Sequence, residues 1–237
     1  MTTQLPAKMF VAEQRGHFEN DHLRVYATFN YSNYFNEHKK AFGPLHLLND
    51  NTLAGNHVSL TKFDEDMYTV LLPIVGTIEY ADNQGVHAVI HSGEMQCGFY
   101  KGNSGFVVKN PYESALVNYL QIGISGSFVE KFEKPQLFQF DIDGYKNVLV
   151  DMTLKEVNPA LPFIMTICKL TSKKELTYFM NDPGNVLYAF AIEGECEVEQ
   201  RLLHARDGLG LQDIHKVEME GLTNNANLLL IEMTQKR

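Results

Sequence analysis

Short apolar runs that end at turn residues recur along the first half of the chain. Runs bounded by Gly, Pro, Asn or Asp in this way are typical of β-strands. Pro73 lies inside one of them, which predicts a β-bulge or a sheet edge because proline cannot donate a hydrogen bond to a neighbouring strand. The predicted strands of this half are residues 68–75, 77–80, 86–90, 106–109 and 115–124.

The second half repeats the same order of elements. Gly76 and Gly93 of the first half have counterparts in Gly194 and Gly208, which stand in comparable turns. Glycine supplies the positive φ that tight turns need, and evenly spaced turns between strands are typical of antiparallel barrels. Two copies of the pattern therefore predict two small barrels. The predicted strands of this half are residues 163–170, 186–192, 195–199 and 227–233.

Helical periodicity is scarce. The best candidate covers residues 126–132, which are soon followed by Pro135. In residues 195–199, glutamates alternate with Cys196 and Val198, and this period of two predicts a strand with one face in water. The fold class predicted from these patterns is all-β, with few short helices.

The charge and composition narrow the classes of function. The 237 residues include 20 Lys plus Arg and 29 Asp plus Glu, so the net charge is −9, and 44% of the residues are hydrophobic. This composition is that of a globular protein. The acidic balance disfavours nucleic acid as a partner, because nucleic-acid binders neutralise phosphates with clustered Lys and Arg.

The N-terminal residues and the cysteines bear on location. Residues 1–16 lack the basic and apolar regions of a signal peptide. No apolar run approaches the roughly 20 residues that cross a membrane. Cys97, Cys168 and Cys196 form no CxxC pair, so we expect reduced, buried thiols rather than zinc ligands. A cytoplasmic protein with no membrane association is expected.

Five segments of the first half resemble, in order, motifs of the pirin-like bicupin family. The likeness extends over roughly residues 15–125, whereas the second half resembles only a generic cupin with its glycine turns. The segments and the matching family motifs are 27–35 with HTFSFADYF, 42–50 with FGPLRVLNDD, 74–82 with LEGELEHRDS, 89–96 with VIRPGDVQ and 119–123 with FLQIWI.

The resemblance implies a bicupin, which consists of two double-stranded β-helix, or jelly-roll, barrels. We place the N-terminal barrel in residues 1–140 and a degenerate C-terminal barrel in residues 141–237, and we allow for chain ends that cross between them. Active members of the family hold an iron-type metal in the N-terminal barrel. Their ligands are two His of an HPHRD motif and the His and Glu of a GILHSEFN motif. Some members cleave quercetin with dioxygen, and eukaryotic pirin is a nuclear transcription cofactor.

The chain departs from the family at these ligand positions. Counting without gaps from Gly76 and from Gln96 places the four positions at Lys62, Asp64, Phe106 and Val108. Only the carboxylate can bind a divalent metal near neutral pH, because lysine is protonated and Phe and Val have no donor atoms. One carboxylate is short of the two His plus carboxylate of typical non-haem iron centres. The sequence therefore predicts a barrel that holds no metal.

Lys62 and Asp64 leave two interpretations open. They stand two residues apart, so that on a strand they would share a face. They either form an ion pair inside the barrel, near the family's metal position, or both lie in solvent. An interior pair needs further hydrogen bonds to offset the loss of hydration.

Histidine and cysteine alternatives have weaker support. His87 and His91 stand four residues apart, a separation of about 13 Å along a strand, which is too long for one metal ion. His46 and His57 flank the barrel motif without a partner pattern. Cys97 is followed four positions later by Lys101, which could lower its pKa, but a structural thiol is the expectation.

Three functions remain at this level. The first is a non-enzymatic bicupin without a cofactor, a monomer or homodimer that binds a small molecule as a sensor or binds a protein partner. The alternative is a metal-dependent quercetin 2,3-dioxygenase, which requires an iron-type metal. The third is a metal-free enzyme that uses Lys62 and Asp64 as acid and base.

Overall fold

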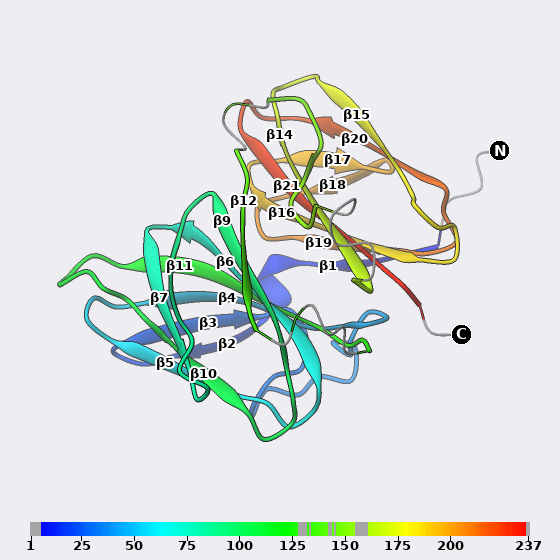
Figure 1. The fold of residues 1–237 in the computed structure, drawn as a ribbon. Helices are drawn as coiled ribbons and strands as arrows, with labels where there is room; N and C mark the ends of the chain where they lie inside the picture. The colour runs from blue at the N-terminus through cyan, green and yellow to red at the C-terminus, as the bar shows by residue number, and fades with distance from the viewer. Residues whose placement is uncertain are drawn as a thin grey trace. The chain divides into compact units, whose positions relative to one another are not determined.

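The computed structural model describes residues 6–127, 132, 134–141, 144, 146–154 and 161–235. Almost all of its regular structure is β, which confirms the predicted fold class (Figure 1). The described residues contain the short 3-10 helix η1 (Ala12–Gln14). None of their helices has the length and apolar character that a membrane span requires. Residues 128–131 of the helix candidate lie outside the described residues, so that helix stays a prediction.

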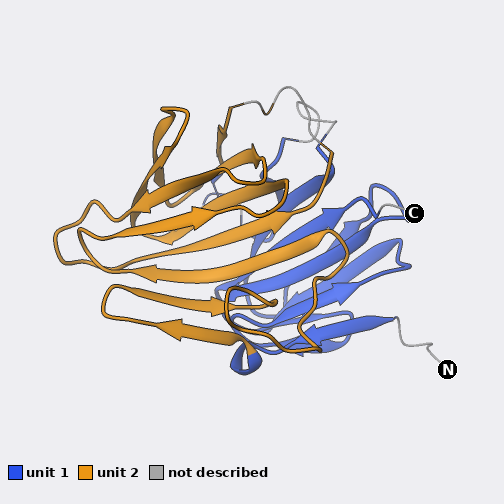
Figure 2. Cartoon of the chain, turned by 90° about the horizontal axis from the view of Figure 1, so that it is seen from below, with its two compact units in different colours: residues 1–14, 140–237 blue, residues 15–139 orange. Residues whose placement is uncertain are grey.

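The chain forms two compact units, residues 15–139 and residues 1–14 with 140–237 (Figure 2). The strand nearest the N-terminus, β1 (Ala7–Phe10), belongs to the second of these because it pairs antiparallel with a strand at 208–211. The first residues of the chain therefore complete a sheet of the C-terminal half. The division into domains 1–140 and 141–237 stays a prediction.

The unit of residues 15–139 contains two antiparallel sheets. One has the order β12-β9-β6-β11-β4-β3-β2, and the other has the order β5-β10-β7-β8. The first consists of β2 (Gly16–Glu19), β3 (Leu23–Ala27), β4 (Leu45–Leu53), β6 (Met67–Val75), β9 (Glu94–Tyr100), β11 (Val117–Ile124) and β12 (Gln136–Gln139). The second consists of β5 (Val58–Lys62), β7 (Thr77–Asp82), β8 (His87–His91) and β10 (Gly105–Lys109).

The other unit also contains two antiparallel sheets, with the orders β1-β19-β16-β21-β14-β13 and β15-β20-β17-β18. The first adds to β1 the strands β13 (Val150–Asp151), β14 (Phe163–Leu170), β16 (Val186–Glu193), β19 (Gly208–Leu211) and β21 (Ala226–Met233). The second consists of β15 (Glu175–Phe179), β17 (Cys196–Val198), β18 (Arg201–Leu203) and β20 (Lys216–Gly221).

The turn residues behave largely as their types require. Gly76 and Gly194 have φ of 83° and 71°, and the β6–β11 register shifts opposite Pro73, which confirms the predicted bulge. Gly208 is different, because it lies at the start of β19, and the positive φ of that turn, 72°, falls on Arg206 instead. Gly208 is needed for space, since a Cβ there would overlap the side chain of Tyr188.

One buried carboxylate organises the loop after β15. Glu232 on β21 is 1% exposed and accepts hydrogen bonds from Tyr178 Oη at 2.7 Å and Asn185 Nδ2 at 2.6 Å. It also accepts bonds from the backbone and the side chain of Asn181. Burial alone would raise the pKa of Glu232, but these hydrogen bonds outweigh it and hold the pKa below its usual value.

Candidate functional site

The direction of the side chains on β5 decides what lies inside the N-terminal barrel. Thr61 is 8% exposed and Phe63 is 4% exposed, so these two face the core. Lys62 and Asp64, which alternate with them, are exposed. On the neighbouring strand β10, Phe106 and Val108 are each 1% exposed. The interior therefore receives Thr61, Phe63, Phe106 and Val108. Of the two interpretations left open for Lys62 and Asp64, the interior ion pair is wrong, and the exposure of both residues agrees with the one that places them in solvent.

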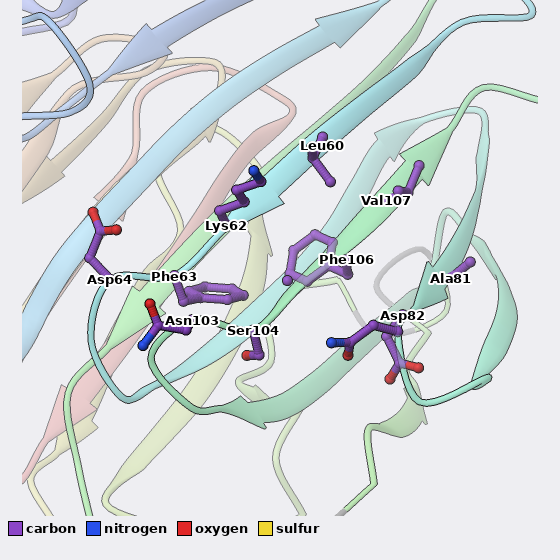
Figure 3. A pocket seen from close by; sticks show the side chains of 12 residues that line it. Leu60, Lys62, Phe63, Asp64, Ala81, Asp82, Asn103, Ser104, Phe106 and Val107 are labelled. Atoms are coloured by element: carbon purple, nitrogen blue, oxygen red, sulfur yellow. The ribbon is translucent and has the colours of Figure 1, made fainter.

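The physical reason is the cost of burying charge. A lysine and an aspartate inside the barrel would need several hydrogen bonds to offset the loss of hydration. A shift of one residue along the strand instead places a benzyl group and a hydroxyl inside. Figure 3 shows Lys62 and Asp64 pointing away from the rings of Phe63 and Phe106.

Four aromatic rings fill this end of the barrel. Phe63 stacks on Tyr100 with the ring centroids 4.8 Å apart, and Phe106 lies 5.1 Å from Tyr100 and 5.4 Å from Tyr80. Phe63 and Phe106 themselves are 5.6 Å apart. We call these four residues the ring cluster. Aromatic pairs at such distances each add about 0.5–1.5 kcal/mol to the stability that comes from burying them.

The two tyrosines of the ring cluster form a short hydrogen-bonded chain. Tyr100 Oη donates to Tyr80 Oη at 2.8 Å, and Tyr80 Oη donates to Asp82 Oδ2 at 3.0 Å. Burial raises the pKa of both phenols far above the usual value. The phenols therefore stay protonated at neutral pH, and they hold the rings in place as neutral donors.

A shallow pocket of about 540 Å³ lies over Phe63 and Phe106 of the ring cluster (Figure 3). Three of the four predicted site residues, Lys62, Asp64 and Phe106, line it together with polar side chains such as Asp82 and Asn103. Val108, the fourth, does not line it and is buried in the core. The structure thus separates the predicted residues into two exposed charges at a rim and two apolar interior groups.

The residues inside the barrel do not fit an iron-type metal. In either register, the end of β5 and the two residues after it supply Lys62 with Asp64 or Thr61 with Phe63, and β10 supplies Phe106 and Val108. A hydroxyl is the sole donor among the four interior side chains. Over the part of the chain that the structure describes, no three His, Cys, Asp or Glu side chains gather in a way that could hold a metal ion.

The histidine alternatives are placed on the surface. His87 and His91 are exposed on β8, where His91 Nδ1 lies 3.0 Å from Thr77 Oγ1. His46 Nδ1 lies 3.1 Å from Glu65 Oε1, and His57 stacks on His22 with the centroids 3.8 Å apart. His57 Nδ1 also lies 2.6 Å from the Gly55 carbonyl oxygen. Among the described residues, these histidines belong to no group that could hold a metal ion.

Cys97 is a structural thiol. It is fully buried on β9, and burial raises its pKa far above the usual value of a thiol. The thiolate that a nucleophile requires is therefore disfavoured. Cys168 and Cys196 are also free and buried, and burial raises the pKa of each to about 12.

The opposite part of the barrel interior carries polar groups that the sequence reasoning missed. Gln121 on β11 is 3% exposed, and its Nε2 lies 3.3 Å from Thr61 Oγ1. Asn49 on β4 is paired directly with Gln121, so both amides lie on the lumen side of the sheet. The sequence feature that could have identified this group is a glutamine within the apolar strand predicted at 115–124. The period of the strand does not show which of its two faces that glutamine occupies.

Two cavities reach Gln121. The larger, of about 770 Å³, has charged residues at its rim, including Lys40, Lys62 and Glu65. The smaller, of about 420 Å³, is lined by Tyr31 and Tyr34 together with side chains of β2, β3, β5 and β11. The interior of the N-terminal barrel is thus divided between an aromatic filling and a polar, accessible part.

Known proteins with a similar sequence carry the name quercetinase or quercetin 2,3-dioxygenase. The family model described as the quercetinase C-terminal cupin domain matches residues 163–233. A putative quercetin 2,3-dioxygenase of Pasteurella multocida is 24% identical over 226 residues, which cover 89% of this chain and 91% of that protein. The quercetin 2,3-dioxygenase of Escherichia coli is 28% identical over 85 residues, 36% of this chain and 37% of that protein.

Solved structures show the same fold. The crystal structure of YhhW from Escherichia coli superposes with a TM-score of 0.83 at 17% identity and covers 98% of this chain and 99% of its own. A second crystal structure, of the bacterial pirin YhhW from Escherichia coli in complex with nickel(II), superposes with a TM-score of 0.81 at 18% identity and covers 98% of this chain and 100% of its own. The chain therefore has an all-β bicupin fold, and its sequence and fold are similar to those of the pirin-like cupins.

Proposed function

We propose that this pirin-like bicupin binds a small molecule in its N-terminal barrel without a metal and without oxygenase activity. It would serve as a sensor or as a protein that presents the bound state to a partner. The observation that carries the proposal is the identity of the interior side chains, since Thr61, Phe63, Phe106 and Val108 offer one hydroxyl and neither an imidazole nor a carboxylate.

The packing of the ring cluster supports this proposal. A metal at this end of the barrel would require the rings of Phe63 and Phe106 to leave an arrangement in which each contacts other aromatic rings. Opening such a core costs several kcal/mol, because large buried side chains cannot be displaced without leaving a void. The site is thus organised for stability rather than for metal chemistry.

The remaining elements of the proposal follow from the sequence. The net charge of −9 favours a small molecule or a protein over nucleic acid as partner. The proposed protein is a monomer or homodimer without a cofactor, and it acts in the cytoplasm; the three free thiols support the reducing compartment. Lys62 and Asp64, being exposed, are poorly placed as an acid and base pair, which weighs against a metal-free enzyme built on them.

The second candidate is a metal-dependent quercetin 2,3-dioxygenase. The observation that favours it is the name of the relatives, one of which aligns with nearly the whole chain. The two candidates differ in the reaction they predict, because ring cleavage of a flavonol consumes dioxygen whereas binding does not.

Oxygen uptake separates these two functions. The purified chain is mixed with quercetin in an oxygen-electrode cell, with and without added iron, nickel or manganese. The Escherichia coli quercetin 2,3-dioxygenase, prepared in the same way, serves as the positive control. We expect no uptake above the rate of free quercetin under any of these conditions. Metal-dependent uptake by the chain would establish the dioxygenase and overturn the proposal.

A further inference from the structure

The smaller cavity of the N-terminal barrel has the size and lining of a ligand site. Its volume is about 420 Å³, within the range of small-molecule pockets, roughly 300–1,000 Å³. Apolar side chains such as Val25 and Ala27 form part of its wall, and both are at most 5% exposed. The Tyr31–Tyr34 turn, closed by backbone hydrogen bonds in both directions, forms another part.

Two buried amides line this cavity and have unused hydrogen-bonding capacity. Gln121 and Asn51 are each 3% exposed. Gln121 exchanges long bonds of 3.3 and 3.5 Å with Thr61, and Asn51 Nδ2 reaches the Asn49 carbonyl at 3.4 Å. An amide side chain offers two N–H donors and an oxygen with two lone pairs. Each of the two therefore retains donors and acceptors for a further partner.

Asn49, directly across from Gln121, strengthens this point. It is 1% exposed, and within the described residues neither its Nδ2 nor its Oδ1 has a hydrogen-bond partner. A buried amide left unpaired costs about 1–3 kcal/mol. Such a cost is usually offset by an ordered water or by a ligand that supplies the missing bonds.

The lining carries no permanent charge. Among the described residues, no Lys, Arg, Asp or Glu side chain lines this cavity, in contrast to the larger one beside it. Its one imidazole, His17, is exposed and lies with Nε2 3.1 Å from Glu19 Oε2, which is the nearest partner for a charge on that ring. Burial raises the pKa of Tyr31, so its phenol remains protonated at neutral pH. A charged ligand would lose its hydration here without gaining a counter-ion, which disfavours anions and cations alike.

We infer that this cavity binds a neutral, planar aromatic compound through a carbonyl, amide or hydroxyl group that bonds to Gln121 and Asn51. The inference rests on the proposed function, since it names the ligand class of that barrel. The rings of Tyr31 and Tyr34 would contact the flat part of the ligand, while the amides fix its polar end.

Paired probes of equal shape test the charge requirement. 2-Naphthamide and 2-naphthoate share their rings and differ in charge, and their affinity for the intact chain is measured by calorimetry. We expect saturable binding of 2-naphthamide at least tenfold tighter than that of 2-naphthoate. Binding is also expected to slow amide hydrogen exchange at residues 31–34 and 58–62, a result that needs no variant.

A pair of variants tests the role of the amide. Gln121→Met removes it at nearly constant shape and is expected to weaken 2-naphthamide binding roughly tenfold. Gln96→Met is the matched control, because Gln96 is also 3% exposed, lies in the same cross-strand row and does not line the cavity. We expect its affinity to match that of the unchanged chain.

Three results would overturn the inference: no saturable binding of 2-naphthamide, equal affinity for 2-naphthoate, or equal effects of the two variants. Exchange protection that falls elsewhere in the chain has the same consequence. A chain without oxygenase activity that fails to bind the probe refutes this inference and leaves the proposed function standing. Metal-dependent oxygen uptake refutes the proposed function instead.

Discussion

Replacing Phe106 by alanine is the sharpest test of the aromatic filling. The side chain is 1% exposed and lies within 5.6 Å, centroid to centroid, of three other rings. Removing a buried Phe side chain from a core that cannot collapse costs about 3–5 kcal/mol. The hydrogen bond between Tyr100 and Tyr80 holds the neighbouring rings, so little relaxation is expected and the cost should lie in the upper part of this range.

The matched control is Val107→Ala on the same strand. Val107 points to the opposite face of β10, beside the exposed Leu60, and is only partly buried. Truncating a side chain of this kind changes the free energy of unfolding by about 1 kcal/mol or less. The two substitutions are at adjacent residues of β10, so a difference between their unfolding free energies reports the interior packing.

Hydrogen exchange measured by mass spectrometry is the appropriate assay, because the chain has two compact units and a single unfolding curve would mix them. Phe106→Ala should speed exchange in residues 105–109 and 77–82 and leave residues 163–170 unchanged. Urea unfolding followed by circular dichroism gives the magnitude. A cost below about 1 kcal/mol, similar to that of Val107→Ala, would refute the packing described for the ring cluster.

Three further predictions concern groups elsewhere in the chain. Glu232→Gln should lower the free energy of unfolding at pH 7 by about 2–4 kcal/mol, because the bonds to a buried carboxylate become weaker and one acceptor becomes a donor. Because the pKa of Glu232 is depressed, this carboxylate stabilises the fold at pH values above the pKa of the unfolded carboxyl, about 4.3, and the contribution is lost as the pH falls through the folded pKa. Glu232→Gln should lack that part of the acid sensitivity. If the curves of unfolding free energy against pH ran parallel for the two proteins, this prediction would be contradicted. Cys97 should resist iodoacetamide in the native chain and react after denaturation, so native labelling mapped to Cys97 by peptide analysis would show that the thiol is accessible. Placing three His and one Glu at interior positions should create nickel binding that calorimetry detects. A control set, in which two of the His stand at the exposed positions 62 and 64, should not bind nickel. Equal binding by the two sets would show that the side-chain directions assigned to residues 61–64 are wrong. The interior set is Thr61→His, Phe63→His, Phe106→His and Val108→Glu, and the exposed set replaces the first two with Lys62→His and Asp64→His.

Local patterns were sufficient for most of the fold. The strands predicted at 68–75 and 163–170 appear as β6 and β14 within one residue, because turn residues mark their ends and apolar runs fill them. The pairing of β1 with β19 could not be predicted from such patterns, since it joins residues about 200 positions apart and depends on the complete tertiary structure.

The candidate site was harder to predict because β5 inverts the usual polarity. Val58 and Leu60 are 59% and 60% exposed, while Ser59 and Thr61 face inward. Alternation alone therefore does not distinguish the two faces, and counting from a distant glycine gives the motif position without its orientation. Gln121 escaped notice for a related reason, because β11 is buried on both faces and carries no polar side to mark the outside.

The central claim, that the N-terminal barrel holds no metal, is tested most directly by the metal content of the chain purified without chelators. Inductively coupled plasma mass spectrometry, normalised to protein concentration, gives the amount of iron, nickel, manganese and zinc per chain. We predict amounts far below one per chain, with no increase after incubation with these ions and removal of the excess. Stoichiometric metal that is lost in the Thr61→Ala variant would place a metal inside the barrel and contradict the account.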